Sequence, residues 1–415
     1  MKLSSFGTRM TAKAGILSLM DDLGRAMAGD EKMIMMGGGN PGRIAAVQEI
    51  LRRRLLAVAA DPHSFDRLIG IYDPPEGKRE FNKALAAMLR RNYGWPVSAE
   101  NICLTNGSQA SFFLLFNMLA GRFDQGAPKK ILLPLAPEYI GYADLGLSND
   151  FFTAVKPRIE FRGDQFFKYR VDFDNLNIAE NIGALCVSRP TNPTGNVLTD
   201  DEISRLAALA RNHAIPLIID NAYGVPFPGI VYTRATPIWD DNLIVCMSLS
   251  KFGLPSARTG IVIARAEIIR SLAAMNAILN LAPTGFGPGL TLDLIADDEI
   301  LTISRKHIRP FYETKMKKAL AVIAECFKGL ACRIHVPEGA MFLWLWFPDL
   351  PVTSNTLYQR LKQRGVLVVS GHFFFPGLQE NWNHRHQCLR ITYSQDDDDV
   401  ARGLRIISDE IRRIV

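Results

Sequence analysis

Short apolar segments that alternate with helical segments are the feature that most constrains the fold of this chain. Such segments are four or five residues long, and polar or glycine-rich residues follow most of them. Their length and near-continuous apolar character predict the strands of a mainly parallel sheet that is covered by helices on both faces. The predicted strands are Asn101–Thr105, Lys130–Pro134, Ala184–Ser188, Pro216–Asp220, Leu243–Met247 and Gly260–Ala264, with helices predicted over 107–120, 139–147 and 200–213.

The last third of the chain has a different pattern. A long helical stretch over about 291–328 precedes short strands, and this predicts a smaller α+β domain. We expect residues 1–60 to pack with that small domain, residues 61–295 to form the large domain, and residues 296–415 to form the small one. The further predicted strands are Cys332–Val336, Ala340–Phe347, Val366–Val369 and Gln387–Tyr393, and the helices are 354–364 and 397–414.

Composition excludes several classes of protein. The net charge of +6 over 415 residues is modest and scattered, which argues against a nucleic-acid-binding surface. No apolar run approaches the roughly 20 residues that span a bilayer, and the N-terminus lacks the apolar core of a signal peptide. The six cysteines form no C-x-x-C pair, so we expect free thiols in a reducing compartment, the cytoplasm.

Two groups of residues could be mistaken for metal sites. The acidic run Asp396–Asp399 precedes an amphipathic segment, and acidic residues are favoured at the start of a helix. The pattern His384-x-His386-x-Cys388 places three metal-ligating residue types at alternate positions, but no partner cluster is visible nearby. We therefore expect no metal.

Lys251 is the first candidate for chemistry. It follows the apolar strand Leu243–Met247, two serines precede it at positions 248 and 250, and Arg258 follows it. Residues just after such strands lie at the edge of the sheet where α/β enzymes place their ligands. A lysine beside hydroxyls and a cation suits covalent attachment to the aldehyde of pyridoxal phosphate (PLP), with the phosphate bound alongside.

Other predicted strand ends supply what PLP requires. Asp220 ends a strand and could pair with the pyridine nitrogen, and Tyr223 follows close behind it. Asn192 lies in a proline-bounded turn, and Gly107 and Ser108 begin a helix, where phosphate binds readily. Each of these residues alone is equally compatible with an ordinary turn or helix cap.

In combination, these motifs resemble the class I and II aminotransferases of fold type I, over nearly the whole chain. Within that family, the chain looks most like the members that exchange amino groups between valine and pyruvate. The resemblance implies a large PLP-binding domain with a mainly parallel sheet and a smaller α+β domain. The motifs that carry it are Asn192–Gly195, Asp220-x-x-Tyr223, Ser248-x-Ser-Lys251, Arg258 and Arg390, with Leu104–Gln109, Leu135–Tyr142, Ser188–Val197, Asp220–Gly229 and Pro337–Ala340.

The family resemblance also implies a role for each site residue. Lys251, Asp220 and Tyr223 are the expected catalytic residues, with Lys251 as cofactor anchor and proton carrier. Arg390, with Gly39 and Asn192, is expected to bind the substrate, Arg390 gripping its α-carboxylate. The residues expected to bind the cofactor are Gly107, Ser108, Gln109, Tyr139, Asn192, Asp220, Tyr223, Ser248, Ser250, Lys251, Arg258 and, from the partner subunit of a homodimer, Tyr72.

The substrate side chain is less tightly constrained. The segment Leu281–Gly289 resembles the region in which aminotransferases that accept dicarboxylates commonly carry a second arginine. It contains no cation, so a small or branched apolar side chain such as that of alanine or valine is favoured. The expected partner substrates are pyruvate and 2-oxoisovalerate. Phe252, Ser256 and Ser370 depart from the usual family residues, and the candidate walls of the pocket are Phe286 and Phe373–Phe375.

Alternatives stay open at this point. Another PLP-dependent reaction, such as β-elimination, or an aminotransferase of different specificity would use the same lysine and aspartate. A regulator built on this domain would carry an added DNA-binding module, for which the chain has no room. The run Gly37–Gly39 lacks the G-x-G-x-x-G spacing of a dinucleotide site.

Overall fold

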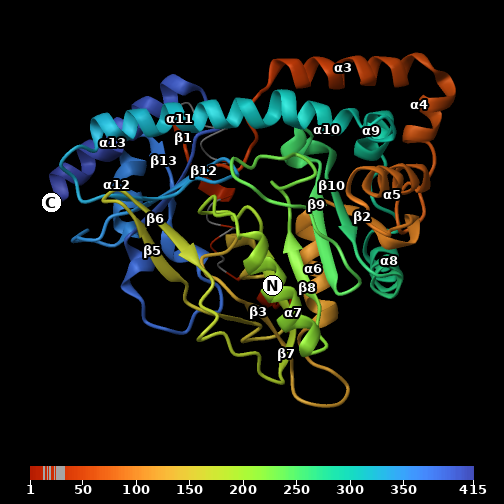
Figure 1. Ribbon diagram of the computed structural model, residues 1–415, viewed down its shortest axis with the longest axis horizontal. Helices are drawn as coiled ribbons and strands as arrows, with labels where there is room; N and C mark the ends of the chain where they lie inside the picture. Colours follow the sequence, from red (N-terminus) through yellow and green to blue (C-terminus); the bar gives the residue numbers. More distant parts are fainter. Residues whose placement is uncertain (13–14, 16, 18–19, 23, 25–32) are drawn as a thin grey trace.

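The computed structural model describes residues 1–415 except 13–14, 16, 18–19, 23 and 25–32. A seven-stranded sheet with helices on both faces lies beside a six-stranded sheet (Figure 1). The strands of the first sheet are β2 (Ile102–Asn106), β3 (Lys130–Leu133), β4 (Phe152–Ala154), β7 (Ile182–Ser188), β8 (Leu217–Asp220), β9 (Leu243–Ser248) and β10 (Thr259–Ile263). Those of the second are β5 (Arg158–Arg162), β6 (Phe166–Arg170), β11 (Arg333–His335), β12 (Phe342–Trp346), β14 (Val369–Ser370) and β15 (Cys388–Thr392).

Helices surround both sheets. Among the described helices, α11 and α13 are the longest, and α11 extends from α10 towards the strands of the six-stranded sheet (Figure 1). The helices are α1 (Ser5–Met10), α3 (Ala45–Ala60), α4 (Pro62–Ile69), α5 (Arg79–Tyr93), α6 (Ser108–Leu119), α7 (Asp200–Asn212), α8 (Ala266–Asn280), α9 (Phe286–Ala296), α10 (Glu299–Ile303), α11 (Arg309–Cys326), α12 (Ser354–Gln363) and α13 (Asp397–Ile414). Within the described part of the chain, none of them combines the length and apolar character needed to cross a bilayer.

The seven-stranded sheet confirms the predicted α/β class. Its order is β2-β10-β9-β8-β7-β3-β4, and all neighbouring pairs are parallel except the two that involve β10. Because β10 runs in the opposite direction, its first residues lie at the same edge as the last residues of β9. That edge is where the predicted site residues should gather.

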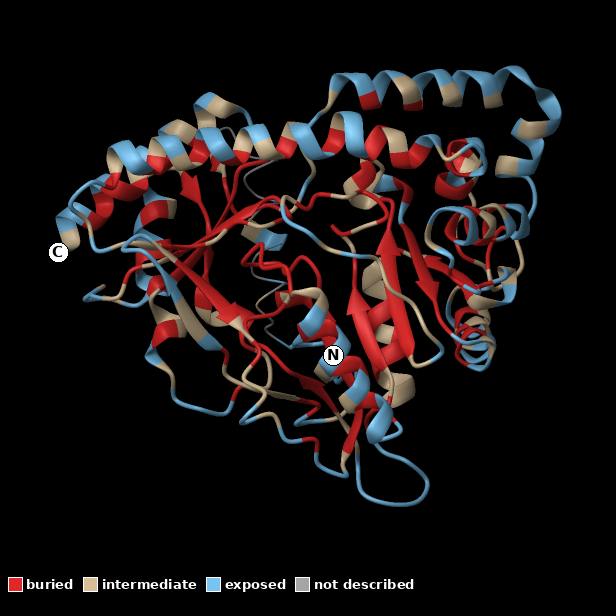
Figure 2. Ribbon diagram, viewed as in Figure 1, coloured by how far each residue is buried: buried red, intermediate tan, exposed pale blue. Residues whose placement is uncertain are grey.

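Alternation along the strands explains why both faces of this sheet are covered. In β8, Ile218 packs in the cluster that contains α6, whereas Leu217 and Ile219 pack in the cluster that contains α7. Successive side chains of a strand point to opposite faces, so an uninterrupted apolar strand must be buried on both. Strands β7, β8, β9 and β10 are accordingly buried throughout, while the outer faces of the helices are exposed (Figure 2).

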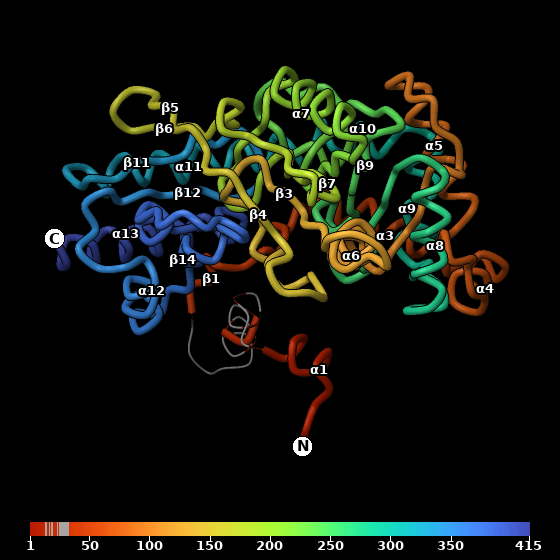
Figure 3. The backbone as a smooth tube through the Cα atoms, turned by 90° about the horizontal axis from the view of Figure 1, so that it is seen from below, coloured from red at the N-terminus to blue at the C-terminus, as the bar shows by residue number. Residues whose placement is uncertain are grey.

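The six-stranded sheet combines distant parts of the chain. Its order is β14-β15-β12-β11-β6-β5, so the β5–β6 hairpin from the middle of the chain pairs with the C-terminal strands. A separate pair joins β1 (Ile34–Met35) to β13 (Val366–Leu367), while α3 packs against α9. Figure 3 shows α12, α13, β11 and β12 on one side of the molecule and α4, α5 and α8 on the other. The division at residues 60 and 295 stays a prediction.

One predicted helix was wrong, and the predicted helical stretch over 291–328 is present but divided. Residues 139–147 form only a short 3-10 turn, Ile140–Tyr142, because Gly141 and Gly146 let the backbone approach aromatic rings: a Cβ there would lie 2.3 Å from Tyr139 and 2.1 Å from Phe151. The stretch over 291–328 is three helices, because the chain turns at Asp298, whose φ of +59° is left-handed. A π-helical turn, Ser304–Ile308, then leads into α11.

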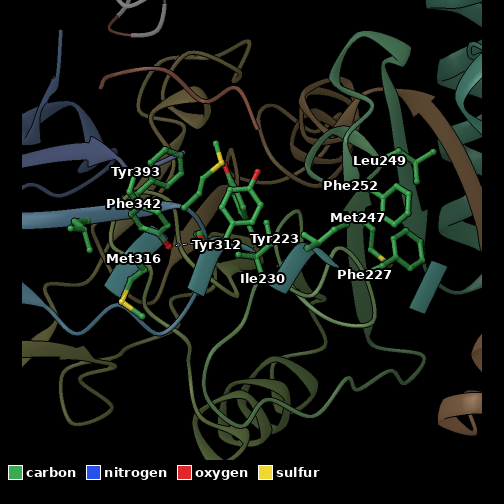
Figure 4. Packing of buried hydrophobic residues seen from close by; sticks show 14 of the residues in the cluster. Tyr223, Phe227, Ile230, Met247, Leu249, Phe252, Tyr312, Met316, Phe342 and Tyr393 are labelled. Atoms are coloured by element: carbon green, nitrogen blue, oxygen red, sulfur yellow. Dashed lines mark hydrogen bonds between the residues drawn. The ribbon is translucent and has the colours of Figure 1, made fainter. Parts of the chain in front are cut away.

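A large apolar cluster lies between the two sheets beneath the predicted site. Tyr223 and Phe252 come from the seven-stranded side, and Phe342 and Tyr393 come from the six-stranded side (Figure 4). The rings of Tyr223 and Phe342 meet edge to face at 5.9 Å. Close packing of this kind fixes relative positions, so residues of both sheets can define one pocket.

Candidate active site

A cavity of about 480 Å³ opens at the edge of the seven-stranded sheet where β7, β8 and β9 end. Such an edge is the usual ligand position in an open α/β sheet. The lining residues come from the ends of strands and the loops that follow them, from the start of α6, from the segment around β1, and from the six-stranded sheet. They are Met20, Met35, Gly38, Gly39, Asn40, Ser108, Gln109, Phe112, Tyr139, Ile140, Ser188, Pro190, Asn192, Asp220, Ala222, Tyr223, Ser248, Ser250, Lys251, Arg258, Arg390 and Gln395.

Lys251 lies in a short 3-10 turn, Ser250–Phe252, that follows β9. Its Nζ donates a hydrogen bond to the carbonyl oxygen of Gly39 at 2.5 Å and lies 5.5 Å from the ring centroid of Tyr223. Burial lowers the pKa of Lys251 to about 8, and the positive charges of Arg390 and Arg258 act in the same direction. The lysine is therefore close to the neutral form that a nucleophile or base must adopt.

Asp220 is the last residue of β8 and has both carboxylate oxygens held. Oδ2 accepts a hydrogen bond from the hydroxyl of Tyr142 at 2.6 Å, and Oδ1 accepts one from the backbone N–H of Ala222 at 3.0 Å. Burial raises the pKa of Asp220, and these two bonds and the charge of Lys251 oppose the rise. The carboxylate is thus fixed in orientation at the floor of the cavity.

The side of the cavity nearest α6 has the composition of an anion site. Ser108 begins α6. The N-cap residue before it is Gly107, with a φ of +89°, so the helix N-terminus has no side-chain cap. Arg258, itself left-handed at φ +46°, lies so close that a Cβ on Gly107 would be 2.1 Å from its Nη2. An uncapped helix N-terminus with an arginine and serine hydroxyls is well suited to a phosphate group.

Arg390 lies on β15, and its side chain reaches the side of the cavity opposite to α6. Its Nη1 donates to Oδ1 of Asn192 at 2.8 Å and its Nη2 donates to the carbonyl oxygen of Gly37 at 2.5 Å. The guanidinium lies 4.4 Å from the ring centroid of Phe342 and 5.2 Å from that of Phe374, and burial lowers its pKa to about 10. Its Nε is buried with no hydrogen-bond partner, so this group is held ready for an anionic ligand.

The structure brings nearly all the predicted site residues to this cavity. Gly107 lies behind Arg258 rather than in the lining, and the amide of Gln109 donates to the carbonyl oxygen of Gly141 at 3.0 Å. Tyr72 lies away from the cavity of its own chain and is 81% exposed. The roles assigned to these residues stay predictions.

The remaining sequence features lie outside the lining. Phe286 is partly exposed at the start of α9, and Phe374 packs behind Arg390 rather than facing the cavity. Of the departures from the family pattern, Phe252 lies in the hydrophobic core. Ser370 is buried, and its hydroxyl forms hydrogen bonds with Ser354 and His372. Among the described residues, no group of three His, Cys, Asp or Glu side chains is placed to hold a metal.

Sequence reasoning assigned no role to three buried residues that surround Asp220. Tyr142 and Glu138 lie in the segment after β3, and Ser188 ends β7. The resemblance motifs contain all three, but only their spatial contacts single them out. A glutamate just after a buried strand was the one signal in the sequence that could have drawn attention.

Comparison with known proteins agrees with this geometry. The sequence profile of the family "Aminotransferase class I and II" matches residues 44–407. The chain is 49% identical to the valine–pyruvate aminotransferase of Escherichia coli (strain K12), covering 100% of this chain and 99% of the relative. Among solved structures, it resembles the valine–pyruvate aminotransferase of Salmonella typhimurium LT2, with a TM-score of 0.89, 49% identity, and coverage of 96% and 99%. It also resembles a putative amino-acid aminotransferase from Psychrobacter arcticum 273-4, with a TM-score of 0.97, 45% identity, and coverage of 100% and 99%.

The residues of the cavity fit PLP. Lys251 and Asp220 lie in one cavity as a partly neutral amine and a fixed carboxylate, matching the aldehyde and the ring nitrogen. The phosphate matches the uncapped start of α6 together with Ser108, Ser248, and Arg258. The chain therefore belongs to the class I and II aminotransferases, and pyridoxal phosphate is its cofactor.

Proposed function

We propose that this protein transfers the amino group of valine to pyruvate, giving 2-oxoisovalerate and alanine. The proposal is supported by the full-length similarity to valine–pyruvate aminotransferases and by the charges that line the cavity. One observation carries the choice of side chain. The described lining contains three cations, Lys251, Arg258 and Arg390, and the PLP chemistry already uses each of them.

In this proposal, Arg390 binds the α-carboxylate of the amino acid. Asn192 and the Gly37 carbonyl hold its two terminal nitrogens, so the guanidinium plane is set before the substrate arrives. A planar guanidinium can donate two parallel hydrogen bonds to a carboxylate. This grip sets the position of the substrate Cα relative to Lys251.

Lys251 carries the proton in the same proposal. When bound, PLP withdraws electrons and stabilises the negative charge that develops on the substrate Cα. The neutral amine of Lys251 would take the proton from Cα and deliver it two atoms away, to the carbon of the cofactor aldehyde, and the lowered pKa keeps that amine available near neutral pH. Asp220 supplies the fixed negative charge at the far end of the ring.

A second substrate carboxylate would have no cation of its own in the described lining. Residues on the remaining walls are largely apolar: Met20, Met35, Phe112, Tyr139 and Ile140. Burying an unpaired charge costs several kcal/mol, whereas an isopropyl group gains from burial. Valine should accordingly exceed aspartate in kcat/KM by about 10²-fold or more.

The proposed function is tested with purified protein, PLP, valine and pyruvate. We expect alanine and 2-oxoisovalerate in equal amounts, measured by chromatography, with aspartate and glutamate as the competing donors. An elimination enzyme would instead form no alanine here and would release ammonia and pyruvate from an amino acid with a leaving group on Cβ, such as serine. Equal rates with aspartate and valine would contradict the assignment of the side chain.

The lowered pKa of Lys251 predicts how cofactor attachment depends on pH. Only the neutral amine attacks the aldehyde, so the rate constant for PLP attachment to the cofactor-free protein should rise about tenfold per pH unit up to about pH 8 and then level off. Stopped-flow absorption between pH 7 and 10 measures this rate. A rate that keeps rising to pH 10 would mean that the lysine is not shifted, and Lys251→Ala supplies the baseline without attachment.

We also propose that the protein is a homodimer in which Tyr72 serves the cavity of the partner. An exposed apolar surface, which we call the α4–α8 surface, consists of Ile69, Ile71, Tyr72, Ile278, Leu279, Leu281 and Phe286. Its two segments are adjacent, since Asn276 Nδ2 donates to the Pro75 carbonyl oxygen at 2.7 Å. A contiguous exposed apolar surface of this kind is typical of an interface.

The α4–α8 surface lies next to the phosphate side of the cavity. The backbone N–H of Thr284 donates to Oδ1 of Asn106 at 2.9 Å, and Asn106 immediately precedes Gly107 and Ser108. In a two-fold dimer the same surface contacts itself, so an exposed residue such as Tyr72 can reach the equivalent region of the partner.

The six cysteines are all unpaired, which fits the proposed location in the cytoplasm.

Mixed dimers test this arrangement. Tyr72→Ala should weaken PLP binding, and Lys251→Ala should remove covalent attachment. If Tyr72 acts across the interface, a hybrid of the two variants contains one cavity with both native residues. Co-refolding the two variants should therefore restore activity that neither has alone at limiting PLP. Sedimentation measures the dimer, and a monomer or an inactive hybrid would overturn the proposal.

A further inference from the structure

A chain of buried hydrogen bonds connects Asp220 to Glu138 through Tyr142 and Ser188, and of these last three only Ser188 lines the cavity. The hydroxyl of Tyr142 donates to Oδ2 of Asp220 at 2.6 Å, and its oxygen lies 3.4 Å from Oγ of Ser188. Ser188 in turn contacts Glu138 twice: its N–H donates to Oε1 at 2.8 Å, and its Oγ lies 2.5 Å from Oε2. Glu138 and Tyr142 have no exposed surface, and Ser188 has only 2%.

Counting protons along this chain distinguishes two states of Glu138. A tyrosine hydroxyl has one hydrogen, and here it goes to Asp220, which leaves the tyrosine oxygen as an acceptor. The single hydrogen of the Ser188 hydroxyl can then go to Tyr142 or to Glu138, but not to both. If Glu138 is ionised, the serine hydrogen goes to the carboxylate and two oxygens face each other across the 3.4 Å contact. If Glu138 carries a proton, every contact holds one hydrogen and all donors point towards Asp220.

Charge favours the second state. Burial raises the pKa of Glu138 to about 8 against the two hydrogen bonds from Ser188, and the negative charge of Asp220 adds to the rise. Among the described residues, Glu138 forms no ion pair. Glu138 and Asp220 are joined by two hydroxyls in a buried region, where two negative charges would repel each other. Carrying one negative charge therefore costs less free energy than carrying two. The cation Lys251 lines the cavity, where it favours the ionised form of Asp220.

We propose that Glu138 is a positioning residue for the cofactor: as a neutral acid it donates to Ser188, Ser188 donates to Tyr142, and Tyr142 donates to Asp220. This ordered chain keeps Asp220 ionised and oriented towards the ring nitrogen of PLP. Aligned hydrogen bonds in a low-dielectric interior strengthen one another, so the effect of the distant acid reaches the aspartate. The proposal rests on the PLP-dependent function above and adds three residues to it.

Cofactor binding to substituted proteins tests the chain. The measured quantity is the dissociation constant of PLP from the cofactor-free protein at pH 7. Tyr142→Phe removes the bond to Asp220 but keeps the ring, which packs against Phe112 at 5.0 Å and Phe116 at 5.2 Å, so the fold should survive. We expect PLP to bind about tenfold more weakly to this variant, since a hydrogen bond to a charged group is lost.

Glu138 is tested by a pair of substitutions. Glu138→Leu removes the donor and should weaken PLP binding by about tenfold, as Tyr142→Phe does. Glu138→Gln keeps the shape and, with an amide N–H, can still donate to Ser188 while its oxygen accepts from the Ser188 N–H. It should restore most of the affinity that Glu138→Leu loses. The matched control is Tyr169→Phe, a buried tyrosine outside the cavity whose hydroxyl accepts from Trp344, and PLP affinity should not change.

Combining the substitutions separates a chain from independent contacts. If Glu138 acts through Tyr142, then Glu138→Leu should cause no additional loss in a Tyr142→Phe background, because the link is already cut. Losses that multiply would overturn the proposal, as would a Glu138→Gln variant that binds PLP as weakly as Glu138→Leu. Unchanged affinity in both Tyr142→Phe and Glu138→Leu would overturn it too.

A second measurement reports on the cofactor itself. PLP labelled with ¹⁵N in the ring shows by its chemical shift whether the ring nitrogen is protonated. That signal should move towards the unprotonated value in Tyr142→Phe and Glu138→Leu, and a purely structural role would leave it in place. If Glu138→Leu does not fold, Ser188→Ala cuts the same chain and should shift the signal equally. A wild-type protein that fails to bind PLP would refute the proposed function instead, so the two failures are distinguishable.

Discussion

Lys251→Ala should reduce kcat/KM for the valine–pyruvate exchange by about 10²–10⁴-fold, the range expected when a positioned acid–base group is lost. The substitution removes both the covalent attachment point and the amine that moves the proton. Its folding should be intact, because Nζ makes one hydrogen bond, to the carbonyl oxygen of Gly39, and is not part of the core. The measurements are the steady-state rate of alanine formation and the visible absorption of the protein after addition of PLP.

The matched control is Lys318→Ala, an exposed lysine paired with Asp397. It should retain the rate and the absorption of the unmodified protein. Added methylamine, a base small enough to enter the space left by the lysine side chain, should partly restore proton transfer in Lys251→Ala. A Lys251→Ala variant with an unchanged visible band would contradict the assignment of this residue as the cofactor anchor.

Arg390→Lys is the second substitution with a large expected effect. An ammonium group cannot reproduce the planar pair of donors, and here both terminal nitrogens already contact Asn192 and Gly37. We expect kcat/KM for valine to fall by about 10²–10³-fold, equivalent to about 3–4 kcal/mol for a buried charged contact. The loss should appear mainly in KM, because the grip exists before and during the reaction.

The control for that substitution is Arg364→Lys, a residue that is not part of the cavity lining and pairs with Glu410. It should leave KM for valine unchanged. PLP binding provides a second control, since Arg390 lies across the cavity from the phosphate side and its replacement should leave cofactor affinity nearly unchanged. Equal losses in PLP affinity and in kcat/KM would mean that Arg390 supports the whole cavity rather than the substrate alone.

The parts of the site that sequence could predict are those set by single strands. Asp220 and Lys251 each follow an apolar strand, and their positions relative to the sheet edge follow from strand direction alone. The Glu138–Ser188–Tyr142 chain could not be predicted in this way. It depends on how the loop after β3 folds over the end of β7, and that geometry is set by tertiary contacts such as the Glu138 N–H bond to the Phe374 carbonyl oxygen.

In the fold, too, the elements set by local sequence could be predicted, whereas those set by long-range contacts could not. All six strands predicted between residues 101 and 264 are present, because each is a local apolar run. The β5–β6 hairpin was not predicted, and its pairing with β11 joins Phe166 to Ile334, 168 positions apart, a relationship that no local pattern encodes. The helix predicted at 139–147 failed for a tertiary reason, since aromatic rings occupy the space that side chains at its glycines would need.

The reversed direction of β10 limits how the length of this sequence can vary. Ser248 at the end of β9 pairs with Gly260 near the start of β10, so the loop between the two strands returns to the edge from which it left. That one loop carries Lys251 and Arg258, and Arg258 has almost no free space beside Gly107. An insertion or deletion within residues 252–257 would therefore change the separation of the two groups that hold the aldehyde and the phosphate of PLP. Libraries that aim to alter substrate preference should keep this loop at constant length and vary the walls around Met35 and Ile140 instead.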